Sequence, residues 1–237
     1  MTTQGITMFG IRHNAQQQKE AFELPANIKA VFNQLARVMQ VSIQGREFGG
    51  LFTEALIEHN APENLTRQEY QRHRERTQPE AERASRTFQQ KATQRGRFAK
   101  MIADWTMSPL EMAYTARTPW TGGWDDFDIT EQNLVFNGQK ISTLANQWPS
   151  SVPSETAFNI VFALCGHTSL HESTHMFITM LNGGRGDTPP RMKGALASPS
   201  DTIGESGDWG EKYMWTSSIG YARAPDAEVR SSIVCSI

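Results

Sequence analysis

The chain has 237 residues, enough for one substantial domain with its own hydrophobic core or for two small ones. Its formal net charge of −2 argues against a protein whose whole surface coats nucleic acid or anionic lipid, and its two cysteines argue against a disulfide scaffold. The first residues are polar, and the most apolar run, residues 157–165, is far shorter than the ~20 residues that cross a bilayer. We therefore expect a cytoplasmic protein without a membrane partner, although a secreted protein whose leader has been removed would look the same.

Two helices are predicted near the N-terminus, after a polar, Gln-rich stretch. Residues 1–24 carry no clear periodicity, and we expect a loosely ordered lead-in. Pro25 suits the start of a helix, and a second helix is predicted from about Phe48 to His59. The first helix is indicated by apolar residues at helical spacing, namely Ile28, Val31, Phe32, Leu35, Val38 and Met39.

A charged segment follows, from Thr66 to Lys100, and Pro79 is predicted to divide it into two helices. One interpretation is an adaptor arm that contacts nucleic acid or an acidic partner. We favour a solvated amphipathic helix, because few aromatic residues are interleaved with the basic ones and the helix carries an apolar stripe that needs burial. We do not expect nucleic acid as a partner. The stripe consists of Phe88, Ala92, Ala99, Ile102 and Trp105.

The character of the sequence changes beyond Pro109, where turn-forming residues become frequent. Asn137-Gly138 stands between two short apolar runs, which is typical of a two-residue hairpin turn, so a small antiparallel sheet is predicted from residues 133–142. Residues 157–165 predict a buried helix that either continues into the next one or ends at Gly166. The chain is thus divided into the lead-in, a helical part over 25–118 and a metal-binding part over 119–237, or the last two form one continuous domain.

The strongest motif is His171-Glu172-Ser173-Thr174-His175, which has the pattern H-E-x-x-H. On a helix, residues four apart share a face, so the two imidazoles can hold one zinc ion with Glu172 beside them to accept a proton. The apolar flanks favour a helix over residues 169–181, and Asn182-Gly183-Gly184 is typical of a helix end. The plainer alternative is a pair of histidines in a protein core.

Together with Gly204-Glu205-Ser206-Gly207-Asp208, this motif resembles the zincin metallopeptidases of the gluzincin type over residues 167–213. The resemblance implies that Glu205 is the third zinc ligand and that Asp208 orients a metal-bound histidine. The sequence departs from the family in spacing, since Glu205 and Asp208 are three rather than four residues apart. The third histidine of the metzincins and the Gly-Thr-x-Asp of the aspzincins are both absent.

Several residues near the motif could have more than one role in the predicted zinc site. Glu211 is a reserve ligand, since Glu205 and Glu211 can hardly face one metal from the same regular helix. His167 could be a ligand or a supporting donor, but we expect it only to lie near the helix start. Tyr213 and Tyr221 are the phenols that could help to bind an oxyanion. Gly204, Gly207 and Gly210 indicate either close packing against another element or a loop.

The sequence therefore predicts an α+β, predominantly helical fold that is zincin-like, with a small antiparallel sheet beside the active-site helix. The predicted function is a hydrolase, a zinc-dependent metallopeptidase in which Zn²⁺ activates a water and Glu172 acts as the base. The substrate would be a peptide or protein that lies along the edge of the predicted hairpin. Two alternatives are a non-catalytic zinc-stabilised or degenerate protease-like domain, and the helical adaptor.

Overall fold

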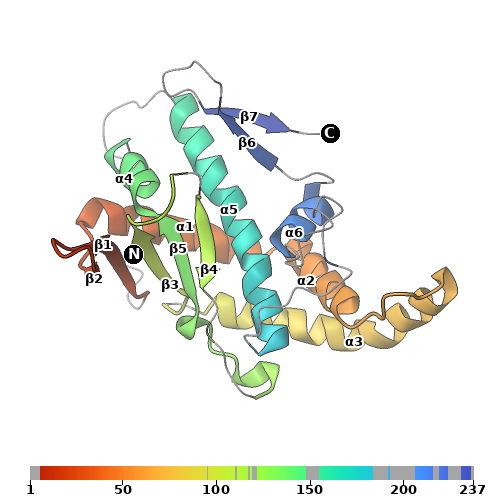
Figure 1. Cartoon of the computed structure of the whole chain (residues 1–237). Helices are drawn as coiled ribbons and strands as arrows, with labels where there is room; N and C mark the ends of the chain where they lie inside the picture. The colour runs from red at the N-terminus through yellow and green to blue at the C-terminus, as the bar shows by residue number, and fades with distance from the viewer. Residues whose placement is uncertain are drawn as a thin grey trace.

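The computed structural model describes residues 6–94, 96–109, 111–116, 118, 122–147, 155–183, 192, 206–215, 219–223 and 231–235. It shows a mixed α+β protein in which helices outweigh a five-stranded sheet, as the sequence predicts (Figure 1). One cluster of buried side chains extends from Leu24 to Met192 and packs between the helices and the sheet. Residue 118 was the predicted boundary between the helical part and the metal-binding part, but strands from before and after it pair in this one sheet.

The sheet is mixed, so the prediction of an antiparallel sheet is wrong. Its strand order is β2-β1-β3-β5-β4; the three inner strands are parallel, and both edge strands run antiparallel to their neighbours. The lead-in is also more ordered than predicted, because residues 8–22 form the hairpin of β1 and β2, in which Gly10 leaves room for the ring of Phe22. The strands are β1 (Met8–His13), β2 (Lys19–Phe22), β3 (Lys100–Asp104), β4 (Ala113–Ala116) and β5 (Asn133–Asn137).

Asn137-Gly138 opens a helix rather than turning a hairpin, which corrects the prediction for residues 133–142. Strand β5 ends at Asn137, and helix α4 (Gly138–Gln147) begins at once. The Asn137 Oδ1 accepts hydrogen bonds from the backbone N–H groups of Gln139 and Lys140, which satisfies helix-start donors. Gly138 is needed because any Cβ there would collide with the Trp105 ring. Asn137 thus caps helix α4, and Gly138 packs closely against Trp105.

Helices α1 (Ala26–Gln44) and α2 (Arg46–His59) lie where the sequence predicts them. Helix α3 (Arg67–Ala92), however, runs unbroken through Pro79, so the predicted division at that residue is wrong. Proline removes one helical hydrogen bond. The Thr66–Glu69 capping box and the burial of residues such as Phe88 against α2 favour the helix on both sides of it. The last members of the predicted stripe, Ile102 and Trp105, belong to β3 and the turn after it.

The motif lies on α5 (Glu155–Asn182), one continuous helix through Gly166. It ends as predicted, with Gly183 at a φ of 61°. Phe177 on its buried face stacks on Phe52 of α2 with ring centroids 4.7 Å apart.

Within the described residues, none of the helices has the length and apolar character that a membrane crossing requires. The remaining elements are the 3₁₀ turns η1 (Trp124–Asp126) and η2 (Ile129–Glu131), helix α6 (Ser206–Trp215), and an antiparallel pair, β6 (Ile219–Arg223) and β7 (Ser231–Cys235).

Candidate metal centre

The two motif histidines converge on one point. On α5 the Nε2 atoms of His171 and His175 lie 3.1 Å apart, and the rings are inclined at 64° to each other. Two imidazole nitrogens on one tetrahedral zinc, at the usual bond length of about 2.0–2.1 Å, are separated by about 3.4 Å. The pair therefore fits a shared zinc ion. The same separation also suits a hydrogen bond between two neutral rings, which is the core-histidine alternative.

The buried carboxylate of Glu211 contacts Nδ1 of His171, the ring nitrogen that does not face His175. The Oε1 atom of Glu211 on α6 lies 2.8 Å from His171 Nδ1, and its Oε2 lies 3.2 Å from His167 Nε2. Burial raises the pKa of Glu211, but the hydrogen bonds and charges of the two histidines outweigh it and lower this pKa to about 2. An ionised carboxylate at Nδ1 keeps the proton on that nitrogen and leaves Nε2 as the electron-pair donor. For His171, Glu211 thus makes the contact that we predicted for Asp208.

Two glycines allow α6 to approach this closely. A Cβ at Gly207 would collide with the His171 ring, and a Cβ at Gly210 would lie 2.5 Å from the Oγ1 of Thr174. Both glycines are buried within a regular helix. Of the two explanations offered for these glycines, close packing against another element is the one observed at positions 207 and 210.

Glu172, the glutamate of the motif, is hydrogen-bonded to a residue of the sheet. Glu172 is only 3% exposed, and its Oε2 accepts a 2.7 Å hydrogen bond from the Oγ1 of Thr115 on β4. Thr115 lies 57 residues before Glu172 and is not among the site residues that the sequence predicts. No local pattern marks this threonine, since only the pairing of β4 with β5 brings it to α5.

The other predicted site residues differ in position. Glu205 lies outside the described residues, and Asp208 lies on α6 without a described side chain, so the third ligand stays a prediction. His167 lies well inside α5, not near its start as predicted. Tyr213 is 46% exposed and stacks on Trp209, and its hydroxyl lies near Gly50 of α2. Tyr221 lies on β6. Among the side chains that the structure describes, no three potential ligands form a cluster suited to a metal.

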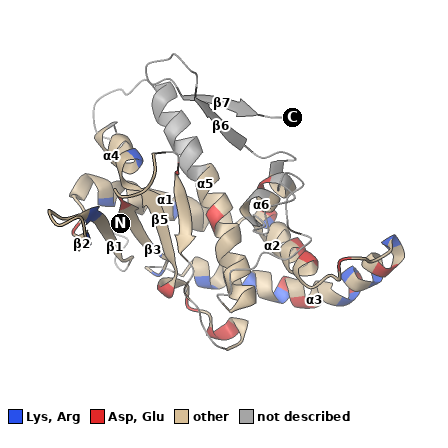
Figure 2. Ribbon diagram, in the orientation of Figure 1, with Lys and Arg blue, Asp and Glu red and all other residues tan. Residues whose placement is uncertain are grey.

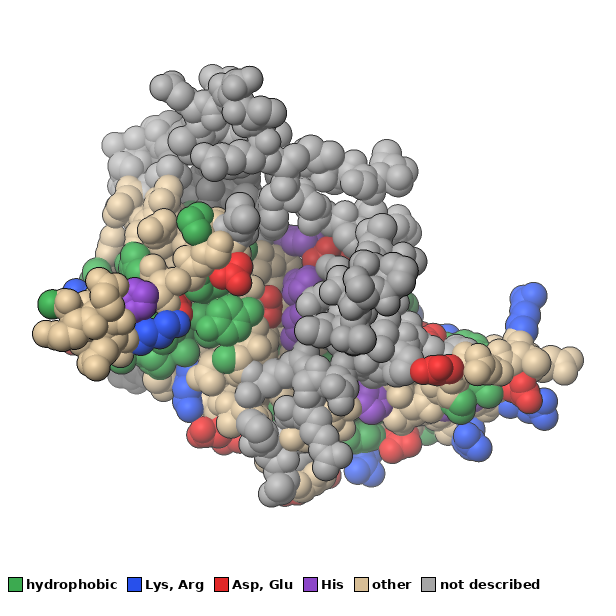
Figure 3. All heavy atoms as spheres, viewed as in Figure 1, with side chains coloured by type: hydrophobic (Ala, Val, Ile, Leu, Met, Phe, Trp, Pro, Cys, Tyr) green, Lys and Arg blue, Asp and Glu red, His purple; other side chains and the backbone are tan. Residues whose placement is uncertain are grey.

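The space-filling view shows histidine and acidic side chains near the middle of one face, in the region of α5 (Figure 3). The basic residues of α3, by contrast, are interspersed with acidic ones along its length (Figure 2). Arg83 pairs with Asp125 at 3.8 Å, and Arg86 pairs with Glu82 at 3.6 Å. These pairings reduce the basic surface that an adaptor arm would offer.

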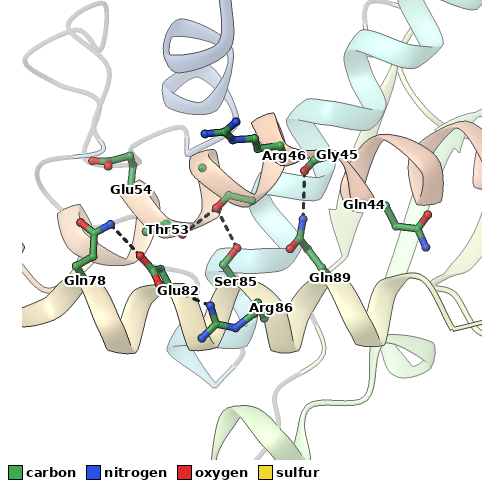
Figure 4. Close-up of a pocket in the computed structure, with 12 residues that line it drawn as sticks. Gln44, Gly45, Arg46, Thr53, Glu54, Gln78, Glu82, Ser85, Arg86 and Gln89 are labelled. Carbon is green, nitrogen blue, oxygen red and sulfur yellow. Dashed lines mark hydrogen bonds and ion pairs between the residues drawn. The ribbon is translucent and has the colours of Figure 1, made fainter.

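A cavity of about 470 Å³ lies between α2 and α3 and is lined mostly by polar residues (Figure 4). Its walls are bonded to one another: Ser85 donates to the carbonyl of Gly49, and Gln78 donates to Glu82. Gln89 also spans to the backbone of α1 at Ile43. The bonds made by Ser85 and Gln89 join α3 to α2 and α1, and we assign the cavity no part in the proposed chemistry of the histidine pair.

Comparison of the chain with models of known protein families, with curated proteins and with solved structures gives no match. The side chains around His171, Glu172 and His175 therefore carry the functional interpretation.

We expect Glu211→Gln to weaken zinc binding by ~10–100-fold without unfolding the protein, because glutamine keeps the shape but loses the charge that favours the Nδ1–H form of His171. Competition with a chromogenic chelator would measure the zinc affinity. Glu80→Gln, at an exposed position of α3, is the matched control. An unchanged affinity in Glu211→Gln would show that this carboxylate does not support the metal centre.

Proposed function

We propose that the chain is a zinc-dependent metallopeptidase of the zincin type, similar to the gluzincins, that hydrolyses peptide bonds. The observation that carries this proposal is the convergence of two imidazole nitrogens next to a buried glutamate on the same helix. His171 and His175 would hold the zinc, together with Glu205 as the third ligand. Asp208 is the alternative third ligand, because α6 passes directly over His171 at Gly207.

A bound zinc ion supplies Lewis acidity, which polarises a carbonyl group and makes a water molecule a stronger acid. Glu172 would accept the proton of the attacking water. It would then donate this proton to the nitrogen of the leaving amine. Its burial supports this role, because a carboxylate with few water neighbours keeps a fixed orientation. Glu211 serves His171 by holding its Nδ1 proton.

An edge strand is available for an extended substrate. The predicted hairpin edge is absent, but β4 lies at the edge of the sheet, pairs with β5 and contacts α5 (Figure 1). An extended peptide can add to such an edge through backbone hydrogen bonds. The scissile bond would then lie close to Glu172, since Thr115 of β4 bonds directly to that side chain.

The proposal is tested by hydrolysis of fluorescein-labelled casein and by zinc analysis of the purified chain. We expect one zinc per chain, loss of hydrolysis in 1,10-phenanthroline, and recovery when zinc is restored. The isomer 1,7-phenanthroline, which cannot chelate, is the control. One zinc per chain with no hydrolysis would favour the non-catalytic zinc-stabilised alternative. Hydrolysis that persists after the metal has been removed would contradict the proposal.

A further inference from the structure

Thr115 is the side chain that joins the sheet to the motif glutamate. Its Oγ1 lies 2.7 Å from Glu172 Oε2 and 3.3 Å from the backbone carbonyl oxygen of the same residue. A hydroxyl has a single proton to donate, and the shorter distance and the charge of the acceptor favour the carboxylate. Thr115 thus engages one oxygen of Glu172 and leaves Oε1 for proton transfer.

Both partners of this hydrogen bond are held by their surroundings. Thr115 lies opposite Leu134 in the ladder between β4 and β5, so the sheet fixes its backbone. Glu172 is 3% exposed on a helix whose neighbouring residues are mostly buried. A carboxylate this far from water needs a donor, because leaving a buried charged group without one is costly. Thr115 supplies that donor from a part of the chain far from the motif.

We propose that Thr115 is a positioning residue for the catalytic base: it fixes the rotamer of Glu172 and reserves Oε1 for the proton of the attacking water. This inference rests on the proposed function and adds a residue to it. Thr115 would act on the chemical step and not on metal binding, because its bond goes to the glutamate and not to either histidine.

Two substitutions of Thr115 separate a positioning role from a packing role. Thr115→Val keeps the shape and removes the O–H, and we expect kcat on labelled casein to fall ~10–100-fold, as for a lost hydrogen bond to a charged group, with KM within ~2-fold. Thr115→Ser keeps the O–H and should restore kcat to within ~3-fold of wild type. Zinc content should stay at the wild-type level in both. Thr143→Val, at an exposed position of α4, is the control, and Thr115→Ala replaces the valine variant if that does not fold.

A double-mutant cycle tests the contact without turnover. Glu172→Met removes the acceptor and keeps an unbranched side chain of similar length. If the bond exists, Thr115→Val should lower the thermal midpoint in the wild-type chain but have a much smaller effect in the Glu172→Met chain. Equal shifts in the two backgrounds would overturn the inference.

The kinetic outcomes separate this inference from the function on which it rests. Wild-type kcat in Thr115→Val, with Glu172→Gln inactive, would overturn the role of Thr115 and leave the peptidase proposal intact. Equal losses in the valine and serine variants would also overturn it, because the threonine would then act through packing alone. A wild-type chain that hydrolyses nothing would overturn both proposals.

Discussion

Replacement of Glu172 by glutamine is expected to lower kcat by ~10²-fold or more while one zinc per chain is retained. Glutamine has nearly the same shape as glutamate but cannot accept the proton of an attacking water. Thr115 can still donate to the amide oxygen, so the local packing should survive. Steady-state hydrolysis of labelled casein and zinc analysis of the same preparations would measure the two effects, with Glu80→Gln as the surface control.

Two results would count against this assignment of Glu172. A loss of zinc as large as the loss of turnover would make Glu172 a structural support for the metal. Undiminished turnover would remove it from the mechanism. Only a loss of catalysis with metal retained fits a base that touches water and not zinc.

His171→Ala and His175→Ala are each expected to abolish stoichiometric zinc, because each removes one of the two nitrogens that converge at 3.1 Å. A ligand that binds only the folded chain raises its stability, so added zinc should raise the thermal midpoint of the wild type and not of the variants. His13→Ala, at an exposed position of β1, is the control. Full zinc content in the double alanine variant would place the metal site elsewhere.

The parts of the fold that were predicted correctly depend on local pattern. The apolar spacing from Ile28 to Met39 predicts α1, and the apolar residues around His171 and His175 predict a helix that ends where Gly183 takes a positive φ. Periodicity and helix ends are visible within a dozen residues. They place the motif on its helix without any knowledge of the rest of the chain.

The errors arose where tertiary contacts override local preference. Pro79 does not break α3, because the helix is buried against α2 on both sides of it. Asn137-Gly138 has the composition of a turn, but Trp105 packs against the glycine and the asparagine caps α4. The strands β1 and β2 arise in a Gln-rich stretch because β1 pairs with β3, which follows some ninety residues later.

The candidate site could be predicted from the sequence only in part, for the same reason. The histidine pair and Glu172 form a motif of five consecutive residues, whereas Glu211 reaches His171 across 40 residues and Thr115 reaches Glu172 across 57. The sequence could place Glu211 among the candidates, but only the packing of α6 on α5 shows which histidine nitrogen it contacts. Thr115 could not be selected from the many threonines of the chain without the sheet.

The close packing of α6 on α5 also restricts which substitutions related sequences can accept. At position 207 any side chain would occupy the space of the His171 ring, and at position 210 it would press on Thr174. A larger residue at either site is compatible with this packing only if its partner becomes smaller or the helices move apart. We therefore expect residues 207 and 171, and residues 210 and 174, to change as pairs. Homologues that keep His171 should keep a glycine opposite it.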